Sequence, residues 1–155
     1  MQIRTADERD LEQIKQLIDR NYDEIMSESH SPEIIKKFKE HSSISNLASQ
    51  LSWKTVYVAD DHGDMAGTGA FANFGTDESP KYSVSNLFVL PERHGKGVGT
   101  QIMNVLIADA RKNHAAAFHV PSSRNAVSFY AKFGFTVDEV QPDAQDEITW
   151  MTMRL

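Results

Sequence analysis

The chain has 155 residues, 40% of them hydrophobic, which is enough for one domain with its own hydrophobic core. It contains no cysteine, so disulfides, thiolate metal sites and a cysteine nucleophile are excluded. The net charge of −6 and the scattered basic residues argue against a nucleic-acid partner. The six histidines form no zinc-binding motif, and we therefore expect no metal.

The hydropathy pattern also excludes a membrane protein. No apolar run approaches the roughly 18 to 20 residues that a membrane-spanning helix needs. The N-terminal residues lack the basic-then-apolar plan of a signal peptide. We therefore expect a cytoplasmic protein with a single domain over residues 1–155 and no membrane partner.

Short strands and amphipathic helices alternate along the chain. The apolar residues recur at helical spacing in some segments and alternate in others, and turn residues separate the segments. The predicted elements are a strand at Ile3–Ala6, a helix through Leu11 and Ile18, a helix after Ser31, a short helical piece at Ser43–Leu51, a hairpin over Lys54–Phe74 with its turn at His62 and Gly63, a strand at Tyr82–Leu90, a helix at Val98–Lys112, a strand at Ala115–Val120, a helix at Arg124–Phe133, and two closing strands at Phe135–Val140 and Glu147–Leu155.

The segment LFVLPERHGKGVGTQIM, Leu87–Met103, places three glycines between a strand and a helix. A tight turn alone usually needs one glycine. A dinucleotide-binding site needs the spacing GxGxxG after the first strand, whereas this chain has GxGxG after a later strand. A Walker-type phosphate loop needs a lysine directly before Ser or Thr, whereas Lys96 lies between two glycines. Bare amides at the start of a helix favour a third interpretation, a cradle for a pyrophosphate group.

The stretch HGKGVG, His94–Gly99, resembles the central motif of the GNAT superfamily of acetyl-CoA-dependent N-acetyltransferases, with His94 in place of Gln or Arg. SSRNAVSFYAKFGF, Ser122–Phe135, is similar to a later segment of that family. The resemblance implies an α/β (α+β) fold. Its mixed, mostly antiparallel sheet of about seven strands would be splayed in the middle and flanked by about four helices.

The resemblance also implies a binding site for acetyl-CoA as co-substrate. The strand residues would pair with the pantetheine arm, the amide of Val89 would face the thioester oxygen, and the amides of the glycine loop would hold the pyrophosphate. Tyr130 would protonate the departing thiolate, since a phenol is a suitable donor at neutral pH. The implied cofactor-binding residues are Leu87, Phe88, Val89, His94, Gly95, Lys96, Gly97, Val98, Gly99, Thr100, Asn125 and Tyr130.

The general base is not identified by the sequence. Many family members carry a glutamate on the central strand, and Asn86 stands at that place here. An amide cannot act as a base, so Asn86 would orient a water or the substrate. His119 is the nearest titratable candidate by sequence, but the position favours a strand-end histidine bonded to backbone over a catalytic role.

The resemblance implies transfer of acetyl to a primary amine by direct attack in a ternary complex. The acceptor is a small amine or a peptide or protein amine, and the sequence does not choose. Carboxylates between Tyr22 and Glu33 could attract a cationic amine, or could be solvated faces of helices. A module that binds acetyl-CoA without turnover is the rival function. The two closing strands contain apolar residues that could also form the interface of a homodimer.

Overall fold

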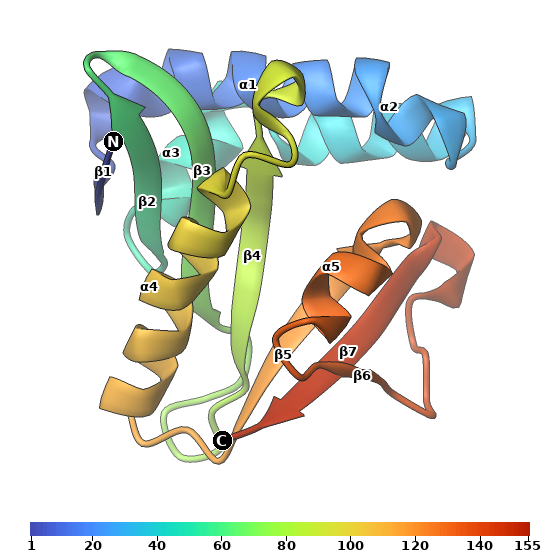
Figure 1. Cartoon of the computed structure of the whole chain (residues 1–155). Coiled ribbons are helices and arrows are strands. Elements are labelled where there is room, and N and C mark those ends of the chain that lie inside the picture. Colours follow the sequence, from blue (N-terminus) through green and yellow to red (C-terminus); the bar gives the residue numbers. More distant parts are fainter.

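The computed structural model describes all residues from 1 to 155. Seven strands form one sheet in the order β1-β2-β3-β4-β5-β7-β6 (Figure 1). No helix has both the length and the apolar character needed to cross a bilayer. The strands are β1 (Gln2–Thr5), β2 (Thr55–Asp61), β3 (Asp64–Asn73), β4 (Tyr82–Val89), β5 (Ala117–Ser123), β6 (Thr136–Val137) and β7 (Ile148–Arg154). The helices are α1 (Leu11–Glu24), α2 (Pro32–His41), α3 (Ile44–Gln50), α4 (Val98–Lys112) and α5 (Val127–Ala131).

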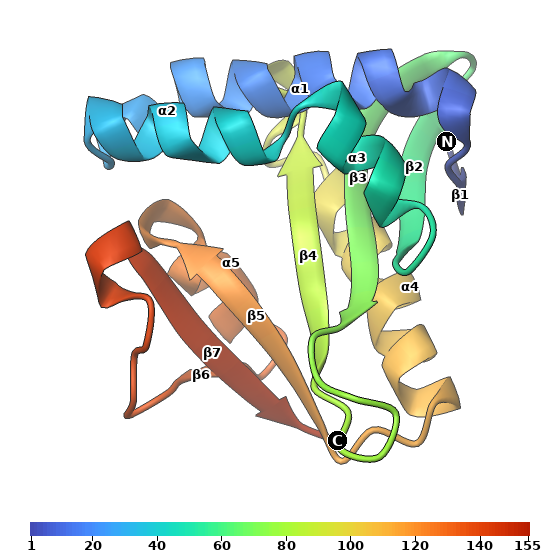
Figure 2. The same ribbon diagram turned by 180° about the vertical axis from the view of Figure 1, so that it is seen from behind.

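Each face of the sheet has its own hydrophobic core. Helices α4 and α5 cover the face seen in Figure 1, where Met103, Leu106 and Phe118 are fully buried. Helices α1, α2 and α3 cover the opposite face, which Figure 2 shows, and bury Ile18 and Val58. The sheet is therefore covered by helices on both sides.

Strands β4 and β5 are the only parallel neighbours, and they share a single residue pair, Ser83 with His119. Every other neighbouring pair of strands is antiparallel. Beyond Ser83 the two strands diverge toward the C-terminal end of β4 (Figures 1 and 2). The predicted mixed, mostly antiparallel sheet of seven strands that splays in the middle is confirmed.

The short helical piece predicted at Ser43–Leu51 is α3, which begins where the Ser43 hydroxyl accepts from the Asn46 amide, and it brings the number of α-helices to five. One strand is shorter than predicted. The strand expected over Phe135–Val140 contains only Thr136 and Val137. It ends early because the Gln141 side chain accepts from the Trp150 amide at 2.7 Å and takes the place of further backbone pairing.

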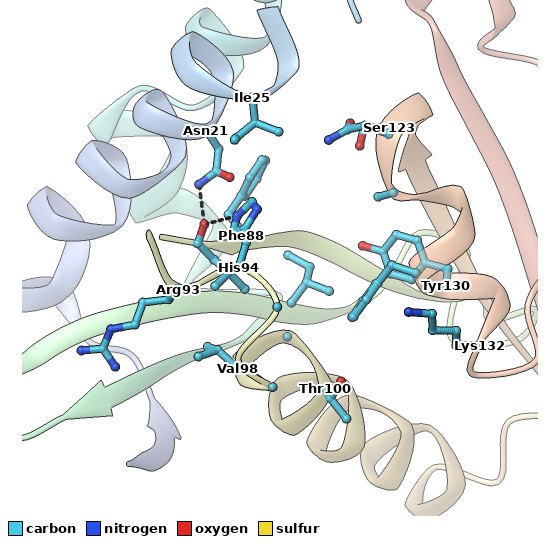
Figure 3. A pocket seen from close by; sticks show the side chains of 18 of the residues that line it. Asn21, Ile25, Phe88, Arg93, His94, Val98, Thr100, Ser123, Tyr130 and Lys132 are labelled. Carbon is cyan, nitrogen blue, oxygen red and sulfur yellow. Dashed lines mark hydrogen bonds between the residues drawn. The ribbon is translucent and has the colours of Figure 1, made fainter. Parts of the chain in front are cut away.

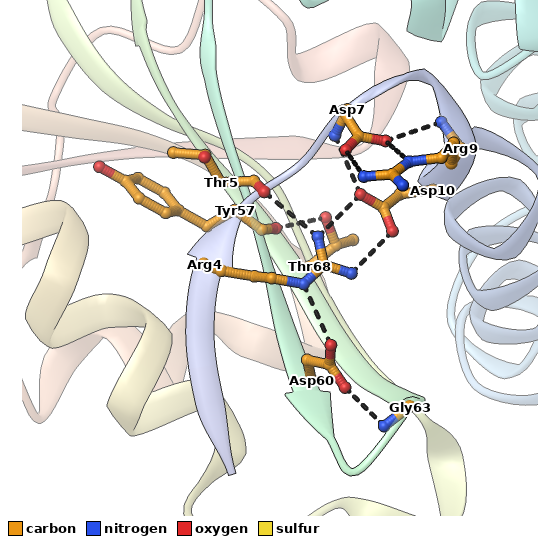
Figure 4. Close-up of polar contacts among 9 residues, drawn as sticks. All are labelled: Arg4, Thr5, Asp7, Arg9, Asp10, Tyr57, Asp60, Gly63 and Thr68. Atoms are coloured by element: carbon orange, nitrogen blue, oxygen red, sulfur yellow. Dashed lines mark hydrogen bonds and ion pairs between the residues drawn. The ribbon is translucent and has the colours of Figure 1, made fainter.

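Ion pairs fix α1 against the sheet (Figure 4). The guanidinium of Arg4, on β1, bonds both carboxylate oxygens of Asp10 at 2.9 Å and Asp60 of β2 at 3.1 Å. Arg4 lowers the pKa of the Asp10 carboxyl below its ordinary value. These contacts hold the start of α1 beside β1 and β2, and so place the end of that helix next to β4.

Candidate active site

A cavity of about 670 Å³ lies where β4 and β5 diverge (Figure 3). The end of α1, the end of β4, the glycine loop with the start of α4, and the segment from β5 to α5 each contribute to its walls. Among the predicted site residues, those that line it are Leu87, Phe88, Val89, His94, Gly95, Gly97, Val98, Gly99, Thr100, Asn125 and Tyr130.

The glycine loop at the wall of this cavity carries a run of free hydrogen-bond donors. None of the six backbone N–H groups from Gly95 to Thr100 donates to a backbone carbonyl, and α4 has no side-chain cap. Gly97 has φ +86°, a conformation that glycine adopts most easily. The positive end of the 15-residue helix α4 adds to the field of these amides. The loop is therefore suited to bind an anion with several oxygens.

The last residues of β4 present a free strand edge. The Leu90 amide donates to the Ala66 carbonyl of β3 at 2.9 Å. Because residues of an antiparallel pair alternately face the partner strand and face away from it, the N–H and C=O of Val89 point away from β3. The Val89 carbonyl accepts from Asn21 Nδ2 at 2.9 Å and from His94 Nε2 at 2.8 Å (Figure 3). These two side chains hold the Val89 carbonyl in place, and the N–H of Val89, on the preceding peptide group, points to the same side of the strand.

His94 therefore has a contact that the sequence did not predict. Its ring bonds the end of β4, whereas the motif implied a residue that binds the cofactor. Lys96 is exposed and does not line the cavity, although its backbone amide belongs to the run of free donors.

Asn86 faces away from the cavity. It has φ +49° at the point where the β3–β4 register shifts, and asparagine tolerates this left-handed conformation better than most residues. Its amide donates to Gln50 Oε1 of α3 at 2.9 Å. The alternative candidate His119 also lies outside the lining, with its Nδ1 3.1 Å from Thr152 Oγ1, and burial lowers the pKa of its ring.

Tyr130 projects from α5 with its hydroxyl in the cavity (Figure 3). The ring is 5% exposed and packs edge-on against Phe129 and Phe135. Burial is the only influence on its pKa, which rises well above the ordinary value of 10, and no hydrogen bond contributes. The phenol therefore stays protonated near neutral pH and has an O–H free to donate.

Several lining residues escaped the sequence analysis, among them Asn21, Arg93 and Lys132. Asn21 is 5% exposed and lies on the apolar stripe of α1, so a polar residue at a core position was the signal that could have found it. Arg93 is bonded to Asp61 at 2.7 Å and anchors the loop before the glycines. Lys132 adds a positive charge beside Tyr130, and no local pattern marks it.

The profile of the acetyltransferase (GNAT) domain family matches residues 26–155, which include the glycine loop, the β4 edge and Tyr130. The chain belongs to the GNAT acetyltransferase family. The predicted family membership is confirmed. The L-methionine sulfoximine/L-methionine sulfone acetyltransferase of Salmonella typhimurium is 28% identical to the chain over 99 residues. The match covers 61% of this chain and 58% of that relative.

Solved structures of GNAT proteins share the fold across nearly the whole chain. The PaiA N-acetyltransferase of Thermoplasma acidophilum in complex with coenzyme A has a TM-score of 0.85 at 18% identity, covering 99% of this chain and 98% of its own. A GNAT acetyltransferase of Brucella melitensis in complex with acetyl-CoA has a TM-score of 0.71 at 18% identity, covering 99% and 87%. At this identity the likeness establishes the fold.

Proposed function

We propose that the protein is an N-acetyltransferase that moves the acetyl group of acetyl-CoA to a primary amine by direct attack in a ternary complex. One observation carries this proposal: free amides, a free strand edge and a buried phenol follow one another along a single cavity. These three features match in order a pyrophosphate, an amide-rich arm and a thioester. Family membership and the coenzyme A bound in solved GNAT structures support the same ligand.

The chain's own groups fit each part of acetyl-CoA. The amides from Gly95 to Thr100 would hold the pyrophosphate, and Lys132 adds a positive charge to the wall. Leu87, Phe88 and Val89 would pair with the pantetheine arm as an added strand. Asn125 is exposed and lines the cavity beside them, where its amide can bond the arm.

Two groups would act on the reacting atoms. The N–H of Val89, which points away from β3, would stabilise negative charge on the thioester oxygen. The Tyr130 hydroxyl would donate a proton to the departing thiolate. No enzyme nucleophile is needed, because the amine attacks the thioester carbon directly.

No aspartate or glutamate lines the cavity, so the chain offers no carboxylate base within it. We propose that water relieves the incoming amine of its proton. Asn86 contributes by holding the bulge that orients the end of β4, since its side chain is committed to Gln50.

The relative from Salmonella typhimurium is named for acetyl transfer to amino-acid analogues, and this favours an amine acceptor of similar size. A module that binds acetyl-CoA without turnover is the alternative. The free Tyr130 hydroxyl favours the enzyme, because a protonated O–H in the cavity can serve as the acid for the departing thiolate.

The test is release of thiol from acetyl-CoA, followed with a colorimetric thiol reagent across amino acids, polyamines, aminoglycosides and peptides. Every thiol detected comes from coenzyme A, because the protein has no cysteine. We expect release that depends on one class of amine and falls in the Tyr130→Phe variant. Binding of acetyl-CoA without release for any amine would instead support the non-catalytic module, and a thermal shift with coenzyme A measures that binding.

A further inference from the structure

Lys54 is a partly buried cation without a counter-ion. It lies between α3 and β2, and its ammonium donates to Ser85 Oγ of β4 at 2.8 Å and to Gln50 Oε1 at 3.1 Å. Both partners are neutral, and Lys54 takes part in none of the ion pairs of the structure. Burial lowers the pKa of Lys54 to about 8, and no nearby charge contributes.

The neutral partners of Lys54 leave its positive charge without a counter-ion. Removing an ammonium from water is unfavourable unless a negative charge offsets the loss of hydration. An apolar side chain of similar length could fill the same space without that loss. Perturbed ionisable groups cluster at functional sites, so Lys54 is a candidate for one.

Lys54 lies beyond the thioester end of the proposed acetyl-CoA site. The glycine loop lies past the C-terminal end of β4, so a ligand whose pyrophosphate binds there runs back along β4 from Val89 toward Leu87. Ser85, which holds Lys54, lies on the same strand, two residues before Leu87 and four before Val89. An acceptor that approaches the thioester from this end of the site therefore has Lys54 along its path.

Two aromatic rings flank the ammonium. Lys54 Nζ lies 4.8 Å from the ring centre of Trp53 and 5.5 Å from that of Phe74. Trp53 is 51% exposed and Phe74 is 41% exposed, which is unusual for rings of this size. The two rings also contact each other, so the cation lies beside a small apolar surface open to a ligand.

We propose that Lys54 binds the carboxylate of the acceptor, which makes the acceptor an amino acid with a free carboxyl group. The inference rests on the proposed function. The carboxylate supplies the missing counter-ion, and Trp53 and Phe74 contact the acceptor side chain. Polyamines are disfavoured, because they would place positive charge beside the ammonium.

The experiment compares amines that differ only in the carboxylate, such as L-methionine with 3-(methylthio)propylamine and L-phenylalanine with phenethylamine. The specificity constant is measured by thiol release for the wild type, Lys54→Met and Lys54→Arg. We expect the wild type to prefer the carboxylate member of each pair. In Lys54→Met the constant for the amino acid should fall about 10- to 100-fold, and that for the plain amine should stay the same.

Two controls separate binding of the carboxylate from a structural role. The melting temperature of Lys54→Met should not fall, and its KM for acetyl-CoA should be unchanged, while Lys54→Arg should keep part of the preference. Lys81→Met is the matched control, because Lys81 also lies over an aromatic ring, Trp150, at 3.9 Å but makes no bond to β4. Its preference for the carboxylate member should match the wild type.

Three results would overturn the inference. They are equal rates for both members of each pair in the wild type, an equal loss for both members in Lys54→Met, and an equal effect of Lys54→Met and Lys81→Met. Any of these leaves the proposed function intact, since thiol is still released with an amine. If no amine of either kind releases thiol, both the proposed function and the inference are refuted.

Discussion

Replacing Gly97 by alanine tests the anion cradle, and Gly63→Ala provides a matched control. Gly97 has φ +86° and Gly63 has φ +94°, and a Cβ at either position would meet no atom within 4 Å. An L-residue in this conformation costs about 1–2 kcal/mol, and lower entropy of the unfolded chain offsets about 0.4–1 kcal/mol. Both variants should therefore lose about 1 kcal/mol, or about 2–4 °C in melting temperature.

Only Gly97→Ala should weaken binding of coenzyme A. Its new methyl group would lie among the six free amides, whereas Gly63 is in the β2–β3 turn, away from the cavity. Loss of one charge-assisted hydrogen bond, at about 1.5–3 kcal/mol, weakens affinity by about 10- to 150-fold. Isothermal titration with coenzyme A measures this change. Equal affinity of Gly97→Ala and wild type, or an equal loss in both variants, would refute the cradle.

Three further variants test other parts of the structure. Tyr130→Phe should lower kcat by about 100-fold or more in the thiol-release assay and leave the melting temperature unchanged, because the hydroxyl has no partner in the chain. Asn86→Ala should lower the free energy of unfolding in urea by about 1–2 kcal/mol, and Asn86→Gly by less, because glycine accepts φ +49°. The lowered pKa of Asp10 gives stability that is present above its ordinary pKa of 3.8 and is lost as the pH falls through the folded value. Arg4→Met should therefore flatten the fall in melting temperature below pH 3.8, and an unchanged slope would contradict this.

The parts of the fold that were predicted depend on neighbours in sequence. Helix α4 runs from Val98 to Lys112 as expected, because a glycine run precedes it and its apolar residues keep helical spacing. The β2–β3 turn also lies where expected, since His62 and Gly63 both take positive φ. Such local signals fix the type of an element and often its ends.

The parts that were not predicted depend on contacts between distant residues. Asn21 reaches Val89 across 68 positions and Lys54 reaches Ser85 across 31, and no spacing rule connects either pair. The early end of β6 likewise follows from one side chain, Gln141, which bonds the neighbouring strand. The candidate site was predicted where a motif marks it, and its supporting contacts were not.

The central claim is that acetyl passes from acetyl-CoA directly to an amine. Mass spectrometry after incubation with isotopically labelled acetyl-CoA tests it, with the protein alone and with an accepting amine. We predict that the amine gains one labelled acetyl group while the protein gains none. Release of coenzyme A with an unmodified amine, or a labelled acetyl group on the protein that then passes to the amine, would contradict the account.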